Sequence, residues 1–127
     1  SAVLAILQNE PERRAFTEVI AAAEQCAMLA ATLVDLSIVM EARFGSDGQG
    51  DLDLFLSTAQ IATVSLDPHQ VQLARAAFSR YGKGRHRAGL NRGDCFSYAL
   101  AKRRDEPLLF KGYDFCHTDL RSACPSR

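Results

Sequence analysis

The chain has 127 residues, of which 47% are hydrophobic and 24% charged, with 15 basic and 15 acidic side chains. This length suits a single domain over residues 1–127 with a substantial core, and the composition is that of an ordinary globular protein. The sequence shows no apolar run of about 18 residues and no secretory signal, which predicts neither a membrane span nor export. Its four irregularly spaced cysteines favour reduced thiols in a cytoplasmic protein over a disulfide framework.

The first part of the chain predicts two helices and a short strand. Ser1 is a good N-cap for the apolar segment 2–7, and residues 10–24 have an amphipathic helical pattern. The apolar run 26–30 has the length of a strand, although its residue types are ambiguous.

A pair of helices is predicted next. Thr32 and Asp35 have the spacing of a capping box, so we expect a helix to begin there and to end at Gly45. The glycine-rich tract 45–51 predicts a turn, and residues 52–59 resume the helical period.

The second half alternates strands with well-signalled helices. Residues 61–66 alternate apolar and polar side chains, as a strand does, and Asp-Pro-His-Gln at 67–70 predicts a helix start. Asn-Arg-Gly-Asp at 91–94 predicts another, and the apolar run 107–110 a short buried strand. Helices that alternate with short apolar strands indicate an α/β fold with a mainly parallel sheet.

Charge is divided unevenly along the chain. Between Arg80 and Lys111 there are nine Lys or Arg and three Asp or Glu, whereas residues 1–79 hold four basic and ten acidic side chains. Three glycines make residues 82–89 a basic loop, and Asp94 follows shortly after it. A basic segment beside a carboxylate is suited to hold a polyanion against a metal ion.

Three passages carry a family resemblance over essentially the whole length. They are SAVLAIL followed by NEPE, then ATLVDLSIVMEARFG, and above all YGKGRHRAGLNRGDCFSYALAK with PLLFKGYDF. The chain resembles PIN-domain ribonucleases and, within them, the VapC toxins of bacterial toxin–antitoxin pairs. The resemblance implies a three-layer α/β sandwich with helices on both sides of a central sheet. It also implies that the family's first strand, with an Asp that ligates metal, lies upstream of Ser1.

The resemblance implies an acidic site for Mg²⁺ or Mn²⁺. The family's second acid, usually Glu, corresponds to Asp35, and the third to Asp94. Asp114 matches a fourth, with Asp119 as an alternative. Carboxylates leave such a metal with open positions, where it activates water for attack on a phosphodiester. The alternative for Asp35 and Asp94 is a purely structural role, because a carboxylate at the third helical position stabilises a helix by itself.

The expected function is that of a metal-dependent endoribonuclease toxin. By resemblance it would cleave a structured RNA such as tRNA or rRNA in a single-stranded loop, pair with a VapB-type antitoxin and form a homodimer. Six side chains of the basic segment are expected to bind the RNA backbone: Arg80, Lys83, Arg85, His86, Arg87 and Arg92.

Several alternatives stay open. The basic segment is also compatible with a solvated surface or with a surface for an acidic antitoxin tail. The site as a whole is compatible with a PIN fold that binds RNA or protein without cutting, or with a nuclease directed at DNA. A zinc site built from the cysteines is disfavoured because their spacing fits no common pattern. The aromatic residues Tyr81, Phe96 and Tyr98 are expected in the core or at a dimer contact rather than under nucleic-acid bases.

Overall fold

The computed structural model describes residues 1–124. The chain divides into two compact units, an N-terminal unit from Ser1 to Val64 and a C-terminal unit from Ser65 onward. Each unit has its own cluster of buried apolar side chains. None of the helices in the described part combines the length and apolarity that crossing a bilayer requires.

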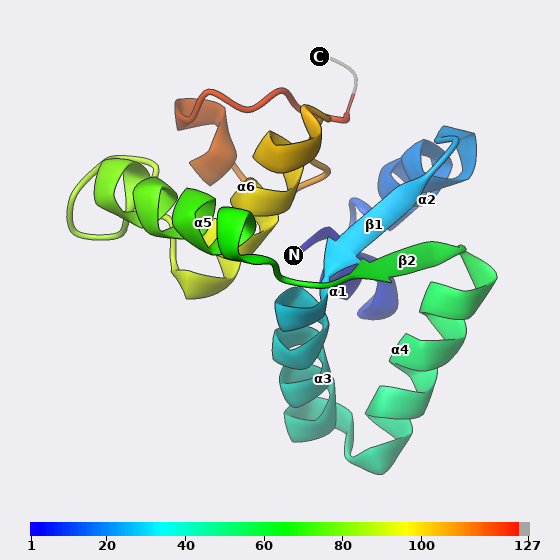
Figure 1. Cartoon of the computed structure of the whole chain (residues 1–127). Coiled ribbons are helices and arrows are strands. Elements are labelled where there is room, and N and C mark those ends of the chain that lie inside the picture. Colours follow the sequence, from blue (N-terminus) through cyan, green and yellow to red (C-terminus); the bar gives the residue numbers. More distant parts are fainter. Residues whose placement is uncertain (125–127) are drawn as a thin grey trace. The chain divides into compact units, whose positions relative to one another are not determined.

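The N-terminal unit contains both strands of the described sheet (Figure 1). Its elements in chain order are α1 (Ala2–Leu7), α2 (Arg13–Ala22), β1 (Cys26–Leu29), α3 (Ala30–Phe44), α4 (Ser46–Thr58) and β2 (Ile61–Val64). The two strands pair in parallel, with Cys26 opposite Ile61 and Leu29 opposite Val64. The crossover between them consists of α3 and α4, and the predicted α/β class with a parallel sheet is confirmed.

Helix α3 begins earlier than the sequence pattern predicts. Leu29 ends β1 in an extended conformation, and the helix starts directly at Ala30, because two alanines with high helical propensity follow. Thr32 and Asp35 therefore lie inside the helix, and the expected capping box at these two residues is wrong. The Thr32 hydroxyl is buried and has no hydrogen-bond partner among the described residues.

The glycine-rich tract 45–51 is not the extended turn that we predicted. Gly45 alone makes the turn, with φ +70°, and α4 begins at the next residue. Gly48 is buried where α4 packs against α3, and a Cβ at this position would collide with the carbonyl oxygen of Met40. Gly48 therefore serves close helix packing, a tertiary requirement that local turn signals do not reveal.

The apolar core of the N-terminal unit joins its helices to its strands. Its buried members are Val3, Met28, Leu36, Met40, Leu52 and Leu56. Leu36 and Met40 follow each other at helical spacing along α3, so this face of the helix is turned inward. From the sequence, Leu36, Val39 and Met40 were compatible with the core or with a partner surface, and the structure places Leu36 and Met40 in the core.

The C-terminal unit is built on two helices that pack against each other, α5 (Pro68–Tyr81) and α6 (Arg92–Arg104). Both predicted capping boxes are present. Asp67 and Gln70 exchange hydrogen bonds at the start of α5, and Asn91 and Asp94 do so at the start of α6. These starts were predictable because a capping box is made entirely within four residues.

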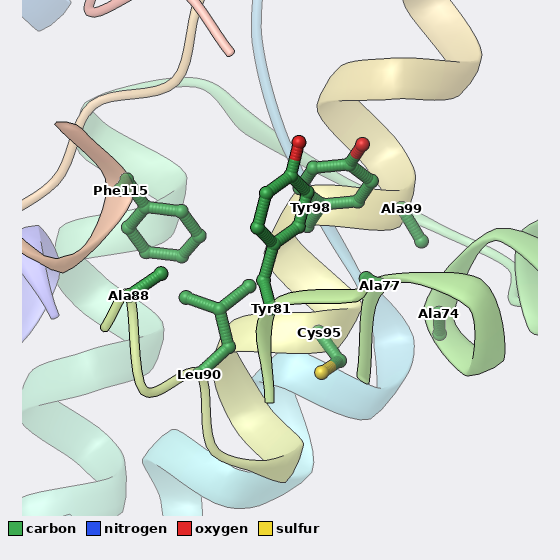
Figure 2. Close-up of a cluster of buried hydrophobic side chains, with 9 residues drawn as sticks. All are labelled: Ala74, Ala77, Tyr81, Ala88, Leu90, Cys95, Tyr98, Ala99 and Phe115. Atoms are coloured by element: carbon green, nitrogen blue, oxygen red, sulfur yellow. The ribbon is translucent and has the colours of Figure 1, made fainter. Parts of the chain in front are cut away.

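Figure 2 shows the buried cluster between these helices and the loop that joins them. Tyr81 of α5 and Tyr98 of α6 are both buried, with ring centroids 5.8 Å apart. Phe96 packs against the same cluster, so all three aromatic residues contribute to the core, as expected. Ala88 and Leu90 enter the cluster from the basic loop and anchor it.

The strand predicted at Pro107–Phe110 does not form among the described residues. Only Leu108 pairs, in a single parallel bridge to Ser122. The Leu108 N–H donates to the Arg121 carbonyl at 2.9 Å, and the Ala123 N–H donates to the Leu108 carbonyl at 2.9 Å. Pro107 lacks an N–H, and the segment meets its partner at one residue only, so no ladder develops.

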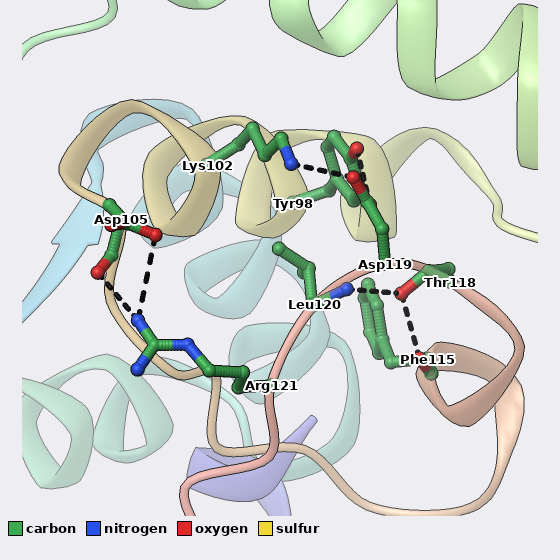
Figure 3. A network of polar contacts seen from close by, with 8 residues as sticks. All are labelled: Tyr98, Lys102, Asp105, Phe115, Thr118, Asp119, Leu120 and Arg121. Atoms are coloured by element: carbon green, nitrogen blue, oxygen red, sulfur yellow. Dashed lines mark hydrogen bonds and ion pairs between the residues drawn. The ribbon is translucent and has the colours of Figure 1, made fainter.

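A polar network fastens the C-terminal segment to α6 (Figure 3). The Tyr98 hydroxyl donates to one Asp119 oxygen at 2.7 Å, and Lys102 donates to the other at 2.5 Å. Arg121 donates to the Asp105 carbonyl at 2.7 Å, at the C-terminal end of α6. The 3₁₀ helix η1 (Asp114–His117) precedes this segment, and its Phe115 is buried in the core.

Replacement of Asp119 by Asn should make the free energy of unfolding less dependent on pH in the acidic range. Partial burial acts to raise the pKa of Asp119, but the bonds from Lys102 and Tyr98 outweigh it and hold the pKa below its ordinary value of 3.8. The carboxylate therefore stabilises the fold above that pH, and this contribution is lost as the pH falls through the folded-state pKa. Urea unfolding should show Asp119→Asn less stable than the parent by about 1 kcal/mol near neutral pH, and this difference should shrink as the pH falls below 3.8.

Asp105→Asn is the matched control, because its carboxylate is fully exposed and lies 3.6 Å from Arg121. The free energy of unfolding of this variant should stay close to that of the parent at neutral and at acidic pH. An equal loss of stability in the two variants near neutral pH would contradict the clamping role of Asp119.

Candidate functional site

The start of α6 holds Asp94 in a fixed orientation. One oxygen of its carboxylate, Oδ2, accepts a hydrogen bond from the Asn91 backbone N–H at 3.0 Å. In return, the Asp94 N–H donates to the Asn91 side-chain oxygen at 2.9 Å. The structural role that we considered for Asp94 is thus present. The capping box uses only the Oδ2 atom of the Asp94 carboxylate. It therefore leaves Oδ1 compatible with a role as a metal ligand.

The surroundings of Asp94 disfavour its negative charge. Burial raises the pKa of this carboxyl, the hydrogen bond from Asn91 acts in the opposite direction, and the charge of Asp114 raises the pKa further. The two carboxylates are thus close enough to repel each other. Bringing a cation to such a pair relieves the repulsion, so the location is electrostatically suited to a divalent metal.

Asp114 occupies the first position of η1 and is exposed. The segment that carries it is anchored by the residue that follows, Phe115. Gly112, with φ +86°, makes the turn before it, and the buried Phe115 ring after it lies with its centroid 5.3 Å from that of Phe110. Asp114 is therefore presented to solvent from a fixed backbone.

Asp119 differs from Asp114 in that both of its oxygens accept hydrogen bonds, from Tyr98 and Lys102. A metal ion at Asp119 would compete with the Lys102 ammonium for the same oxygen. Between the two alternatives for a fourth acid, the contacts of Asp119 are those of a structural clamp, whereas Asp114 is exposed and acts electrostatically on Asp94.

Asp35 belongs to the N-terminal unit, in the second turn of α3. It is partly buried and follows the carboxyl end of β1, the end of a parallel strand at which ligands bind in open α/β sheets. Because it is not in the first turn, the capping explanation for this acid does not apply. Within each unit, the described residues contain no group of three His, Cys, Asp or Glu that could hold a metal ion.

The basic loop between α5 and α6 has a defined backbone. The Leu90 N–H donates to the Tyr81 carbonyl and the Lys83 N–H donates to the Leu90 carbonyl, both at 2.9 Å, and these bonds close the loop at its base. The His86 Nδ1 accepts a hydrogen bond from the Ala88 N–H at 3.0 Å. This geometry gives His86 a role in shaping the loop.

The cationic side chains of this loop point outward. Lys83, Arg85 and Arg87 are exposed, while Ala88 and Leu90 beneath them are fully buried. Two arginines lie against aromatic rings, with the Arg80 guanidinium 4.9 Å from the Tyr81 centroid and that of Arg85 5.4 Å from the Phe78 centroid. Arg92 is exposed in the first turn of α6. The loop thus presents several cations from a fixed backbone, close in sequence to Asp94.

The cysteines do not form a metal site in the described structure. No disulfide joins Cys26, Cys95, Cys116 or Cys124 among the described residues. Burial raises the pKa of the Cys95 thiol, and the neighbouring charge of Asp94 raises it further, so this group stays protonated near neutral pH. The donors that remain near Asp94 are carboxylate oxygens, which suit Mg²⁺ or Mn²⁺ better than zinc.

One surface residue was absent from our predicted site. Tyr113 directly precedes Asp114 and is 75% exposed, more than any other large hydrophobic side chain described. The sequence carried a signal for it, since an aromatic residue stands between a turn glycine and a candidate metal ligand.

Comparison with known proteins identifies the family. A family model of the PIN domain matches residues 1–120. The chain is 49% identical to "VapC ribonuclease Mb0640" of Mycobacterium bovis over 120 residues, which cover 94% of this chain and 92% of that protein. It is 50% identical to "Ribonuclease VapC" of Mycolicibacterium smegmatis, with coverage of 94% and 93%.

A more distant relative matches over the full length. "Ribonuclease VapC28" of Mycobacterium tuberculosis is 39% identical over 128 residues, which cover 100% of this chain and 96% of that protein. Together with the PIN-domain match and the α/β architecture, these identities confirm the resemblance seen in the sequence. The chain belongs to the PIN-domain family and, within it, to the VapC type.

Proposed function

We propose that this VapC-type chain is a metal-dependent endoribonuclease toxin that cuts a structured RNA in a single-stranded loop. The observation that carries the proposal is the repulsion between two carboxylates, Asp94 in the first turn of α6 after the basic loop and Asp114 in η1. The names of the relatives, which contain the word ribonuclease, support RNA as the substrate.

The roles of the acids follow from their contacts. We assign Asp94 and Asp114 as ligands of Mg²⁺ or Mn²⁺, since both offer hard oxygen donors and their repulsion favours a cation. Asp35 is assigned as a further ligand because it matches the family's second acid. Being one methylene shorter than the usual Glu, it would contact the metal more weakly or through water. The metal, when bound, supplies an activated water and neutralises charge on the leaving oxygen.

The basic loop would hold the RNA backbone. Exposed Lys83, Arg85 and Arg87 offer charge-assisted hydrogen bonds to phosphates, and the fixed backbone beneath them reduces the entropy lost on binding. Arg80 and Arg92 would extend this surface toward the helices on either side. Such contacts position the nucleic acid without reading its bases, so sequence preference must come from elsewhere.

The proposed partners are a VapB-type antitoxin and a second copy of this chain, in the cytoplasm. Val34 and Ile38 lie one turn apart on α3 and are 57% and 60% exposed, and Leu54 of α4 is 69% exposed. An amphipathic helix is a suitable occupant for apolar side chains at this spacing. These residues replace the buried Leu36 and Met40 as the candidates for a partner surface.

Asp94→Asn should strongly reduce RNA cleavage without unfolding the protein. Removal of a group that merely supports a metal ligand typically lowers activity about 10- to 100-fold. Loss of Asp94, a proposed ligand itself, should lower the cleavage rate by at least as much. Asp94 has a raised pKa, so its charged form disfavours the fold above that pKa, and a neutral amide that still accepts from Asn91 removes this effect. Stability near neutral pH should therefore be equal or higher.

The measurement uses the intact protein with end-labelled tRNAs, ribosomal stem-loops and matching DNA, in Mg²⁺, Mn²⁺ or EDTA. Cleavage of RNA at one loop, lost with EDTA and in Asp94→Asn, is the expected result. RNA binding without any cleavage would point to a PIN domain that binds only, and preferential cutting of DNA would point to a DNA-directed nuclease.

Arg87→Ala should weaken RNA binding uniformly across sequences and make it less sensitive to salt. Each lost phosphate contact lowers the slope of log affinity against log salt by about 0.7 for a single strand. Arg14→Ala is a matched control, because Arg14 is 92% exposed on α2 and is paired with Glu18 at 3.2 Å. Filter binding at several salt concentrations, with Asp94→Asn as parent, tests this. If the slope of log affinity against log salt is equal for Arg87→Ala and Arg14→Ala, Arg87 does not contact the RNA backbone.

A further inference from the structure

The most exposed large hydrophobic side chain of the described structure is the ring of Tyr113, at 75%. Other aromatic residues of the C-terminal unit are covered, with Tyr81, Tyr98 and Phe115 only 4%, 5% and 6% exposed. Phe78 is 39% exposed and lies under the Arg85 guanidinium. Within the part of the chain that the structure describes, the Tyr113 ring has no such aromatic or cationic neighbour.

The backbone beneath this ring is held in place. The Tyr113 carbonyl accepts a hydrogen bond from the Cys116 N–H at 3.1 Å, which closes the turn of η1. Two residues further on, Phe115 is buried in the apolar cluster, as Figure 2 shows. The ring is therefore a platform with only two side-chain torsions to fix, and binding a flat ligand on it costs little conformational entropy.

The Tyr113 ring is next in sequence to one of the two proposed metal ligands, Asp94 and Asp114. Tyr113 is bonded directly to Asp114, whose charge acts on Asp94. A nucleotide whose phosphate lies at these acids would bring a base to within reach of a side chain one residue away. Unpaired bases stack on aromatic rings, and this mode of recognition is common for single-stranded RNA.

We propose that Tyr113 is a stacking platform for one unpaired nucleobase of the RNA, next to the bond that is cut. This inference rests on the proposed function and adds a base contact to the phosphate contacts of the basic loop. A stacked base is held by its flat face, so Tyr113 would select an unpaired nucleotide over a paired one and would tolerate different bases. It would thus favour a loop over a duplex, which backbone contacts alone do not.

The experiment measures the binding of a fluorescent single-stranded RNA to the intact protein by anisotropy, with cleavage prevented by Asp94→Asn. Tyr113→Ala should raise Kd by about 5- to 150-fold, the range that corresponds to one stacked base. Tyr113→Phe keeps the ring and should bind like the parent, whereas Tyr113→Leu keeps an apolar side chain without a ring and should bind like Tyr113→Ala. Phe44→Ala removes an aromatic ring that is 49% exposed in the N-terminal unit, so it is the matched control and should leave Kd unchanged.

A second series locates the base. RNAs with a single abasic nucleotide at successive positions around the cut are bound to the parent and to Tyr113→Ala. At one position the two proteins should bind equally well, because the contact that Tyr113 makes has already been lost. A Tyr113→Ala variant that binds as tightly as its parent would overturn the proposal. So would an equal effect of Tyr113→Ala on every abasic RNA.

Failure of this proposal and failure of the proposed function are distinguishable. If the unsubstituted protein cuts RNA while Tyr113→Ala binds normally, only the stacking role is overturned. If the unsubstituted protein neither cuts nor binds RNA, the nuclease function fails and the stacking role fails with it. Urea unfolding of each variant confirms that a change in Kd does not reflect unfolding.

Discussion

The reciprocal hydrogen bonds between Asn91 and Asp94 are the constraint on which the C-terminal unit depends. They set the first residue of α6 directly after the basic loop, and α6 in turn carries the two residues that hold Asp119. The segment held by Asp119 follows the turn that presents Asp114. One capping box thus orients a candidate metal ligand and fixes the helix from which the rest of the unit is tied together.

The acids of this unit divide into two kinds. The pKa of Asp94 is raised by burial and by the charge of Asp114, while bonds from Lys102 and Tyr98 hold the pKa of Asp119 low. The negative charge of Asp94 would be stabilised by a bound cation, whereas the charge of Asp119 is already paired with the Lys102 ammonium. Charges that disfavour the fold are retained at sites where a ligand compensates for them. This contrast separates the proposed metal ligands from the structural carboxylate, although all are Asp residues.

Local chemistry explains what the sequence could predict. The starts of α5 and α6 were predicted because Asp67 with Gln70 and Asn91 with Asp94 complete their bonds within four residues. Thr32 and Asp35 show the same spacing inside a helix that begins at Ala30, so spacing alone misled. The roles of Asp114 and Asp119 were not separable in the sequence, since Asp119 is engaged by residues 17 and 21 positions away. Gly48 likewise depends on packing against Met40.

The most direct measurement of the central claim is the affinity for Mn²⁺, by calorimetry on the intact protein and on two variants. Our account predicts that Asp114→Asn weakens Mn²⁺ binding about 10-fold or more, the scale typical of perturbed metal sites. It predicts that Asp119→Asn, which loses a structural carboxylate, binds Mn²⁺ as the parent does. Weakened binding in Asp119→Asn with unchanged binding in Asp114→Asn would contradict the assignment of the metal ligands.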